Sequence, residues 1–169
     1  HTLRGDYNNY IANSKLNLSL NLNGAYTKNA VIRNVETVDN PDPNLPGSKI
    51  NETHFLNVSG VYRLTGNYNI SKQLSNRKYN LQLNGTVSYN HSLSMRDGIL
   101  NTTDITTLDQ RFGTKINPTE WFEINPNIGY KNEKSNSTLR SGNNEINTLS
   151  LNLDGRLYLW DVWMLGYNG

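Results

Sequence analysis

The chain has 169 residues, with 16 lysines and arginines against 14 aspartates and glutamates, and its formal net charge is +2. So small a net charge, without a lysine-rich arm, gives no indication of nucleic acid or another acidic partner. The absence of cysteine excludes disulfide bonds and thiolate chemistry. No apolar run is long enough for a transmembrane helix. The segment HTLRGDYNNY at residues 1–10 has no signal-peptide core, so we expect a processed chain or an internal piece.

Asparagine is the unusual residue, since it occurs 29 times. Asparagine favours turns and loops over strands, and so polar a composition is also compatible with disorder. The apolar residues are nevertheless phased rather than scattered. In YNLQLNGTVSYN at residues 79–90, leucine, valine, glycine and tyrosine alternate with asparagine, glutamine, threonine and serine. A period of two predicts an extended strand whose two faces meet different environments.

Alternating segments of this kind follow one another along the chain. We expect strands at residues 15–26, 55–70, 79–90, 108–116, 122–131 and 148–159, with a seventh beginning after residue 162. No stretch has a helical period, so the predicted class is all-β, with about seven or eight antiparallel up-and-down strands. Pro126 lies inside the fifth strand, where it removes a backbone donor, and predicts a bulge or weak pairing.

The predicted connections alternate in length. Those near residues 72–77, 117–121 and 160–162 are short, whereas those near 31–52, 91–106 and 132–146 are long and polar. Short turns at one end and long loops at the other are typical of an up-and-down barrel in an outer membrane.

Two environments fit the alternation. A soluble β-sandwich also has strands with one apolar and one polar face. The alternating runs here, however, reach about 12 to 16 residues, whereas strands of globular proteins usually have about 5 to 6. From Tyr79 to Tyr89 is ten steps. At roughly 3.3 Å per step and a tilt of roughly 40°, these rise about 25 Å, the height of the apolar band of an outer-membrane barrel.

Aromatic residues gather at the ends of the runs, as the two aromatic girdles of a membrane barrel do. Tyr26 and Tyr62 lie toward the long connections. The predicted girdle residues are Tyr68, Tyr79, Tyr89, Trp121, Phe122, Tyr130, Trp160 and Trp163. Together, length, phase and aromatic placement favour transmembrane β-barrel strands, with the apolar face toward lipid and the polar face toward a lumen.

Three stretches carry a resemblance to a known family. They are TLRGDYNN leading into LNLSLNLNGAYTKNAVI, YNLQLNGTVSYN, and RFGTKINPTEWFEINPNIGYKNEK, whose strand–turn–strand unit is the most specific. The chain resembles the C-terminal barrel region of TonB-dependent outer-membrane receptors of the Bacteroidetes type, including SusC-like families. The resemblance covers nearly the whole chain and consists of strand patterns rather than catalytic signatures.

The resemblance implies a barrel of about 22 strands closed around a plug. We therefore expect residues 1–169 to form a partial outer-membrane barrel domain without plug, TonB box or closing C-terminal strand. The implied function is import of a large nutrient, such as a glycan, peptide or metal chelate, and not catalysis. The implied partners are outer-membrane lipid, the rest of the barrel and plug, a surface lipoprotein and the TonB complex. A small eight-stranded barrel and a soluble adhesive β-sandwich remain alternatives.

Charged residues on the polar phase are the candidate functional side chains. They are Arg63, Asp109, Arg111, Lys115, Glu123, Asp154 and Arg156. If Phe122 pairs with Ile116, Lys115 lies opposite Glu123, and opposite charges across a strand pair are favourable. A structural role fits these charges better than a transport site.

Other motifs give weaker signals. His1, His54 and His91 lack the spacing of metal ligands, and no catalytic triad order or phosphate loop is present. Asp39 and Asp42 could offer oxygen ligands to calcium, but a plain polar loop is the better interpretation. Arg4-Gly5-Asp6 spells an adhesion tripeptide, which at three residues is weak evidence. We expect no metal, cofactor or nucleic-acid partner.

Overall fold

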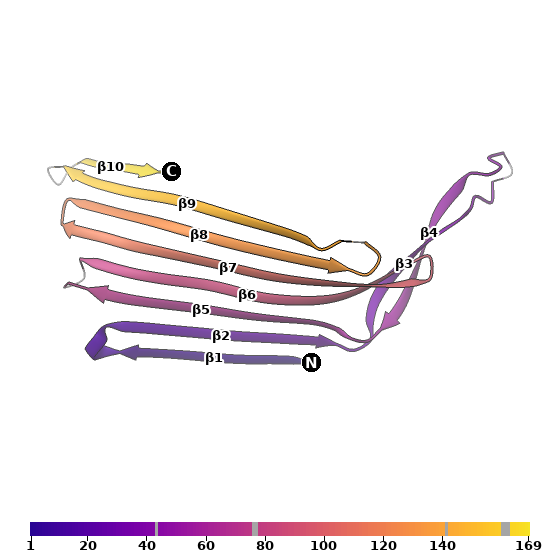
Figure 1. Cartoon of the computed structure of the whole chain (residues 1–169), viewed down its shortest axis with the longest axis horizontal. Coiled ribbons are helices and arrows are strands. Elements are labelled where there is room, and N and C mark those ends of the chain that lie inside the picture. Colours follow the sequence, from indigo (N-terminus) through magenta and orange to yellow (C-terminus); the bar gives the residue numbers. More distant parts are fainter. Residues whose placement is uncertain (43, 76–77, 141, 160–162) are drawn as a thin grey trace.

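The chain forms one sheet of ten strands, seen in a computed structural model that describes residues 1–42, 44–75, 78–140, 142–159 and 163–169 (Figure 1). The all-β class is therefore confirmed, with more strands than predicted. The elements are β1 (Thr2–Ile11), η1 (Ala12–Ser14), β2 (Leu16–Thr27), β3 (Ala30–Asp39), β4 (Lys49–Val58), β5 (Val61–Leu74), β6 (Tyr79–Arg96), β7 (Ile99–Thr119), β8 (Phe122–Ser137), β9 (Asn144–Leu159) and β10 (Trp163–Asn168). Within the described residues, no helix is long and apolar enough to cross a membrane.

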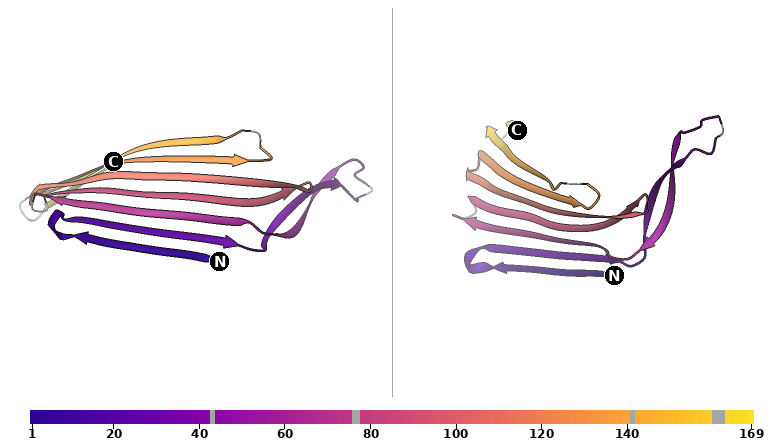
Figure 2. Two further views of the ribbon diagram at one scale, coloured as in Figure 1. Left: turned by 60° about the horizontal axis from the view of Figure 1, so that its bottom comes forward. Right: turned by 45° about the vertical axis from the view of Figure 1, so that its right-hand side comes forward.

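Neighbouring strands of the main sheet are antiparallel, in the order β1-β2-β5-β6-β7-β8-β9-β10. Between β2 and β5 the chain makes an excursion, the β3–β4 hairpin, which rises from one end of the sheet (Figure 2). We call this the hairpin end, and the end with the β1–β2 and β7–β8 connections the short-turn end. Within the described residues β1 and β10 each pair with one neighbour, so the sheet is open rather than closed into a barrel.

The three long polar loops expected from the sequence are wrong in extent. Residues 31–52 form most of the β3–β4 hairpin, and residues 91–106 continue β6 and β7 around a turn at Asp97-Gly98. Both turn residues have positive φ, 49° and 73°, as a tight two-residue hairpin requires. Residues 132–146 likewise extend β8 and β9, leaving residues 138–143 as the connection. Residues 132–137 of β8 are polar on both faces, and in β3 the apolar residues Val31 and Ile32 are adjacent, so neither segment shows the alternation that predicts a strand.

The register preserves the two faces across the whole main sheet. Straight across the strands from Leu18 lie Ile70, Leu83, Phe112, Ile128 and Leu151. Straight across from Asn21 lie Asn67, Thr86, Asp109, Lys131 and Thr148. Because a slip of one residue would exchange the faces, this register separates an apolar face from a polar face over six strands.

The sheet is a single layer without a conventional core. Among the described residues the only buried hydrophobic side chain is that of Ile32, which belongs to the β3–β4 hairpin. A β-sandwich would bury one face of each sheet against the other. The described strands all belong to one sheet, so the sandwich alternative is not the architecture seen here.

The irregularity expected at Pro126 is found beside it. Pro126 pairs with Leu153 of β9, whereas on the β7 side the pairing passes from Gly113–Asn127 to Ile116–Ile124. The register then shifts between Ile116 and Thr119. Proline cannot donate to β7, and the ladder is interrupted on that side.

Gly85 makes room for an aromatic ring on the apolar face. Gly85 of β6 pairs directly with Tyr68 of β5, and a Cβ atom at Gly85 would overlap the Tyr68 ring. The ring thus covers the bare backbone of the glycine, which is the arrangement that stabilises glycine in a strand by aromatic contact.

We predict that Gly85→Ala lowers the free energy of unfolding by about 1 kcal/mol, because the Tyr68 ring must leave its place over the backbone. The measurement is a denaturant titration of the folded protein. Gly5→Ala is the matched control, since a Cβ at Gly5 on the same face meets nothing within 4 Å. In a Tyr68→Ala background the Gly85→Ala cost should disappear; a cost that persists would contradict the ring contact.

Candidate functional site on the two faces of the sheet

The apolar face is exposed over most of its area. Leu149 and Leu151 of β9 are 77% and 73% exposed, and Phe112 and Ile128 are each 49% exposed. Leucine, valine and tyrosine residues of β2, β5 and β6 on the same face are exposed as well. A contiguous apolar surface of this kind marks a site of contact with another molecule or with lipid.

The apolar face forms a band that crosses the strands at a slant. Its border toward the hairpin end is marked by Tyr26 on β2, Tyr62 on β5, Tyr89 on β6 and Tyr130 on β8. Tyr26 pairs with Tyr62, and the pairing continues straight across the sheet to Asn136 on β8. Tyr130 lies six residues nearer the short-turn end than Asn136. Six residues correspond to about 20 Å along a strand, and the four strand spacings between β2 and β8 to about 19 Å. The border therefore crosses the strands at about 45°.

The opposite border of the band runs in the same sense. From Leu16 at the start of β2 it passes to Tyr79 on β6 and Phe122 on β8. The positions straight across from Leu16 are Leu81 on β6 and Pro126 on β8. Tyr79 lies two residues nearer the short-turn end than Leu81, and Phe122 four residues nearer than Pro126. Both borders of the band therefore cross the strands obliquely and in the same direction.

The predicted girdle residues divide between these borders and the interior of the band. Tyr89 and Tyr130 lie on one border, and Tyr79 and Phe122 on the other, where the Trp121 and Phe122 rings are 6.1 Å apart. Tyr68 lies inside the band, six residues before the end of β5, over Gly85. Trp160 and the side chain of Trp163 lie outside the part of the chain that is described.

The polar face is connected by hydrogen bonds that run across the strands. The Asn21 amide donates to the Asp6 carboxylate, the Asn67 amide donates to Asn21 Oδ1 at 3.3 Å, and the Thr86 hydroxyl donates to Asn67 Oδ1 at 2.8 Å. This row joins β1, β2, β5 and β6. Amide side chains, which carry both donor and acceptor, can continue such a row across any number of strands. The asparagine content thus supplies a polar surface with little net charge.

All seven charged candidates lie on this polar face, and the structure groups five of them. Arg111 Nε lies 3.5 Å from Asp109 Oδ1. Lys115, Glu123 and Arg156 form a second group near the short-turn end. Asp154 lies opposite Asn125, and Arg63 stands apart between Ala25 and Asn90. Among the described residues, none of these groups combines a nucleophile with a base.

Glu123 is the most buried of the charged candidates, at 8% exposed. Its carboxylate accepts from Lys115 Nζ at 2.9 Å and from Asn125 Nδ2 at 3.1 Å, and Arg156 lies directly opposite on β9. The predicted contact between Lys115 and Glu123 is therefore made. The register assumed for it is wrong, because Ile116 pairs with Ile124 rather than with Phe122, and the contact is diagonal.

A polar cluster that the sequence did not reveal lies just beyond the Tyr89 border. Asp104 Oδ1 accepts from the Tyr89 hydroxyl at 2.7 Å and lies 2.6 Å from His91 Nδ1. The Tyr89 and His91 hydrogen bonds lower the pKa of Asp104 below its usual value of 3.8. The His91 ring also stacks on Tyr62 at 4.8 Å. These polar side chains lie at the edge of the apolar band. The Asp-Gly sequence at residues 97–98 could have predicted the β6–β7 hairpin turn, and with it the pairing that brings His91 next to Asp104.

The remaining motifs have structural partners. Arg4 pairs with Asp6 at 2.9 Å inside a strand, His54 lies 3.5 Å from Glu52, and the His1 ring lies 6.5 Å from Tyr26. Asp42 accepts from the backbone of Asn44 at 2.9 Å within its own loop. Over the described residues, no three histidine, aspartate or glutamate side chains gather in a way that could hold a metal ion.

We predict that Lys115→Gln lowers the free energy of unfolding by about 1–3 kcal/mol, because it leaves the buried Glu123 carboxylate without its closest cation. The control is Lys131→Gln, since the Lys131–Glu133 pair at 3.3 Å is exposed on both sides and should change stability by about 0.5 kcal/mol or less. Denaturant titration measures both variants. Adding Glu123→Gln should recover part of the loss; equal effects of the two lysine variants would contradict this assignment.

Comparisons of the chain with protein-family models, with curated proteins and with solved structures gave no match.

Proposed function

We propose that this chain forms part of the wall of an outer-membrane transporter of the TonB-dependent receptor type. The apolar band faces lipid, and the polar face lines the interior through which a large nutrient passes. The energy for import comes from a TonB-type complex acting on a plug, and this chain supplies wall and outer connections rather than catalysis.

The slanted apolar band is the observation that carries the membrane part of this proposal. Strands of outer-membrane barrels tilt by about 35–45° from the membrane normal. A level border between lipid and water therefore crosses such strands obliquely, moving by a residue or two at each strand. The border from Tyr26 to Tyr130 is displaced by six residues over four strand spacings, which corresponds to the required tilt.

The exposure of the same band supports lipid as the covering medium. Lipid can cover an apolar face continuously and adapts to gaps left by glycine such as Gly66, whereas water cannot cover an apolar face without cost. The strands β2 and β5 to β8 each have a hydrogen-bonded neighbour on both sides, whereas β9 pairs with β8 over residues 144–157 and with β10 only over residues 154–159. Pairing on both sides is what a hydrocarbon environment requires of a backbone.

The polar face supports the transport part. Its amide and hydroxyl groups, joined from Asp6 to Thr86, present donors and acceptors to a polar solute with few fixed charges. The resemblance of RFGTKINPTEWFEINPNIGYKNEK to strand–turn–strand units of TonB-dependent receptors supplies the choice of transporter type.

We predict that Leu151→Arg lowers the free energy of unfolding in lipid bilayers by about 2–4 kcal/mol, because the new charge enters hydrocarbon. Leu151 is 73% exposed and lies within the apolar run of β9 between Leu149 and Leu157, the partners of Tyr130 and Phe122. The matched control is Asn152→Arg, one residue along β9 on the polar face, which should cost little. The measurement is a denaturant titration of both variants folded in bilayers, and equal costs would contradict a lipid-facing band.

A further inference from the structure

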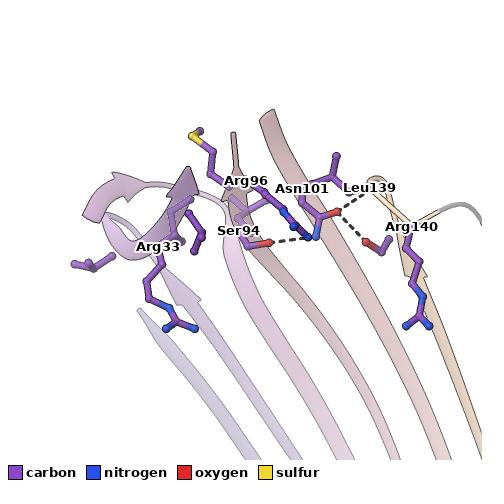
Figure 3. A pocket seen from close by; sticks show the side chains of 12 residues that line it. Arg33, Ser94, Arg96, Asn101, Leu139 and Arg140 are labelled. Carbon is purple, nitrogen blue, oxygen red and sulfur yellow. Dashed lines mark hydrogen bonds between the residues drawn. The ribbon is translucent and has the colours of Figure 1, made fainter. Parts of the chain in front are cut away.

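A hollow of about 860 Å³ lies at the hairpin end of the sheet (Figure 3). Residues of β3, the end of β6, the start of β7 and the segment after β8 line it. This volume falls within the roughly 300–1,000 Å³ of small-molecule sites. The hollow lies beyond the aromatic borders and shares no residue with the charged groups described above.

One wall of the hollow is fixed by the side chain of Asn101. Asn101 Oδ1 accepts from the Ser137 hydroxyl at 2.8 Å, the Thr138 hydroxyl at 3.1 Å and the Leu139 backbone at 2.9 Å. Asn101 Nδ2 donates to the Ser94 hydroxyl at 3.1 Å. A single amide thus ties the segment after β8, up to the residue before Arg140, to the β6–β7 hairpin.

The opposite wall, β3, is attached to the β6–β7 turn. The backbone N–H of Asp97 donates to Val35 O at 3.0 Å, and the backbone N–H of Thr37 donates to Asp97 Oδ1 at 2.9 Å. Asn34 and Val35 also pair in parallel with Met95 and Arg96. Both walls are therefore held by hydrogen bonds before any ligand arrives, which lowers the entropy cost of binding.

Three arginines and no acidic residue line the hollow. Arg33 comes from β3, Arg96 from the end of β6 and Arg140 from the segment after β8. Figure 3 shows Arg96 reaching toward Asn101, with Arg33 and Arg140 on either side of it. Arg96 is 3.9 Å from Asp97, while Arg33 and Arg140 make no ion pair with any described residue. The lining therefore carries an excess of positive charge.

The rest of the lining is largely apolar. It includes Val31, Ile32, Val35, Leu93, Met95 and Leu139. Ile32 is buried, whereas Val31 and Leu139 are 67% and 45% exposed, so the lining offers open apolar area to a ligand. A ligand that fills the space needs apolar area as well as negative charge.

We propose that this hollow binds an organic anion, namely a carboxylate, sulfate or phosphate group carried on an apolar body. The guanidinium group suits such a ligand, because it stays charged and offers paired donors to oxyanions. The three arginines are exposed, but the two walls that carry them are held by hydrogen bonds, and the same lining includes apolar side chains. The site goes beyond the proposed transport role, since it does not require the sheet to face lipid.

The test measures binding of 2-naphthalenesulfonate to the purified full chain by fluorescence titration at constant ionic strength. Inorganic sulfate is the probe with charge alone, and neutral 2-naphthol the probe with the apolar body alone. Naphthalenesulfonate should bind more tightly than either. In the triple variant Arg33→Gln, Arg96→Gln and Arg140→Gln, its affinity should fall at least tenfold, about the effect of one lost charge-assisted contact.

A second triple variant controls for net charge. Lys28→Gln, Lys49→Gln and Lys78→Gln remove three exposed positive charges outside the hollow and should leave the affinity within about twofold. Circular dichroism of both variants checks that the sheet is retained. No saturable binding, or binding that survives the arginine substitutions, would overturn the proposal. Replacing naphthalenesulfonate by 2-naphthoate and 2-naphthyl phosphate distinguishes which oxyanion the arginines prefer.

Discussion

A single-layer sheet with one apolar face depends on whatever covers that face. Folded soluble domains bury apolar side chains between two layers, and the gain from this burial offsets the entropy lost on folding. In this chain the described core is reduced to Ile32, while leucines such as Leu149 and Leu151 remain largely exposed. The stability of the fold therefore depends on the medium or partner at the apolar face, and the proposed answer is lipid.

The two faces divide the physical tasks of the proposed transporter wall. On the apolar face, Tyr68 over Gly85 shows how side chains fill gaps laterally, without a second layer. On the polar face, rows of amides and the Lys115–Glu123 contact satisfy polar groups from strand to strand. In the proposed transporter, these polar groups line the passage for the solute. Recognition of a defined ligand is expected where strands extend beyond the band, as at the hollow with its three arginines.

The period of two was enough to predict the class, the faces and the central strands, because side chains on opposite faces meet different surroundings. It missed β1, β3 and the outer parts of β6 to β9, and the single strand predicted at residues 55–70 is divided between β4 and β5. The outer part of β8 is polar on both faces, and β3 has the adjacent apolar residues Val31 and Ile32, so neither shows a clear period of two. The Lys115–Glu123 contact was predictable from the turn, but its diagonal register was not, because the irregularity between Ile116 and Thr119 changes the pairing. The hollow could not be predicted, since it joins residues 31–35, 93–101 and 137–140 through tertiary contacts.

The most direct test of a lipid-facing band is site-directed spin labelling along residues 81–88 of β6, with the protein in lipid bilayers. Collision rates with oxygen, which concentrates in lipid, and with a water-soluble nickel complex are measured at each position. The account predicts maxima for oxygen at Leu81, Leu83 and Val87, and maxima for nickel at Gln82, Asn84 and Ser88. Uniform accessibility along the strand, or the opposite phase, would contradict it.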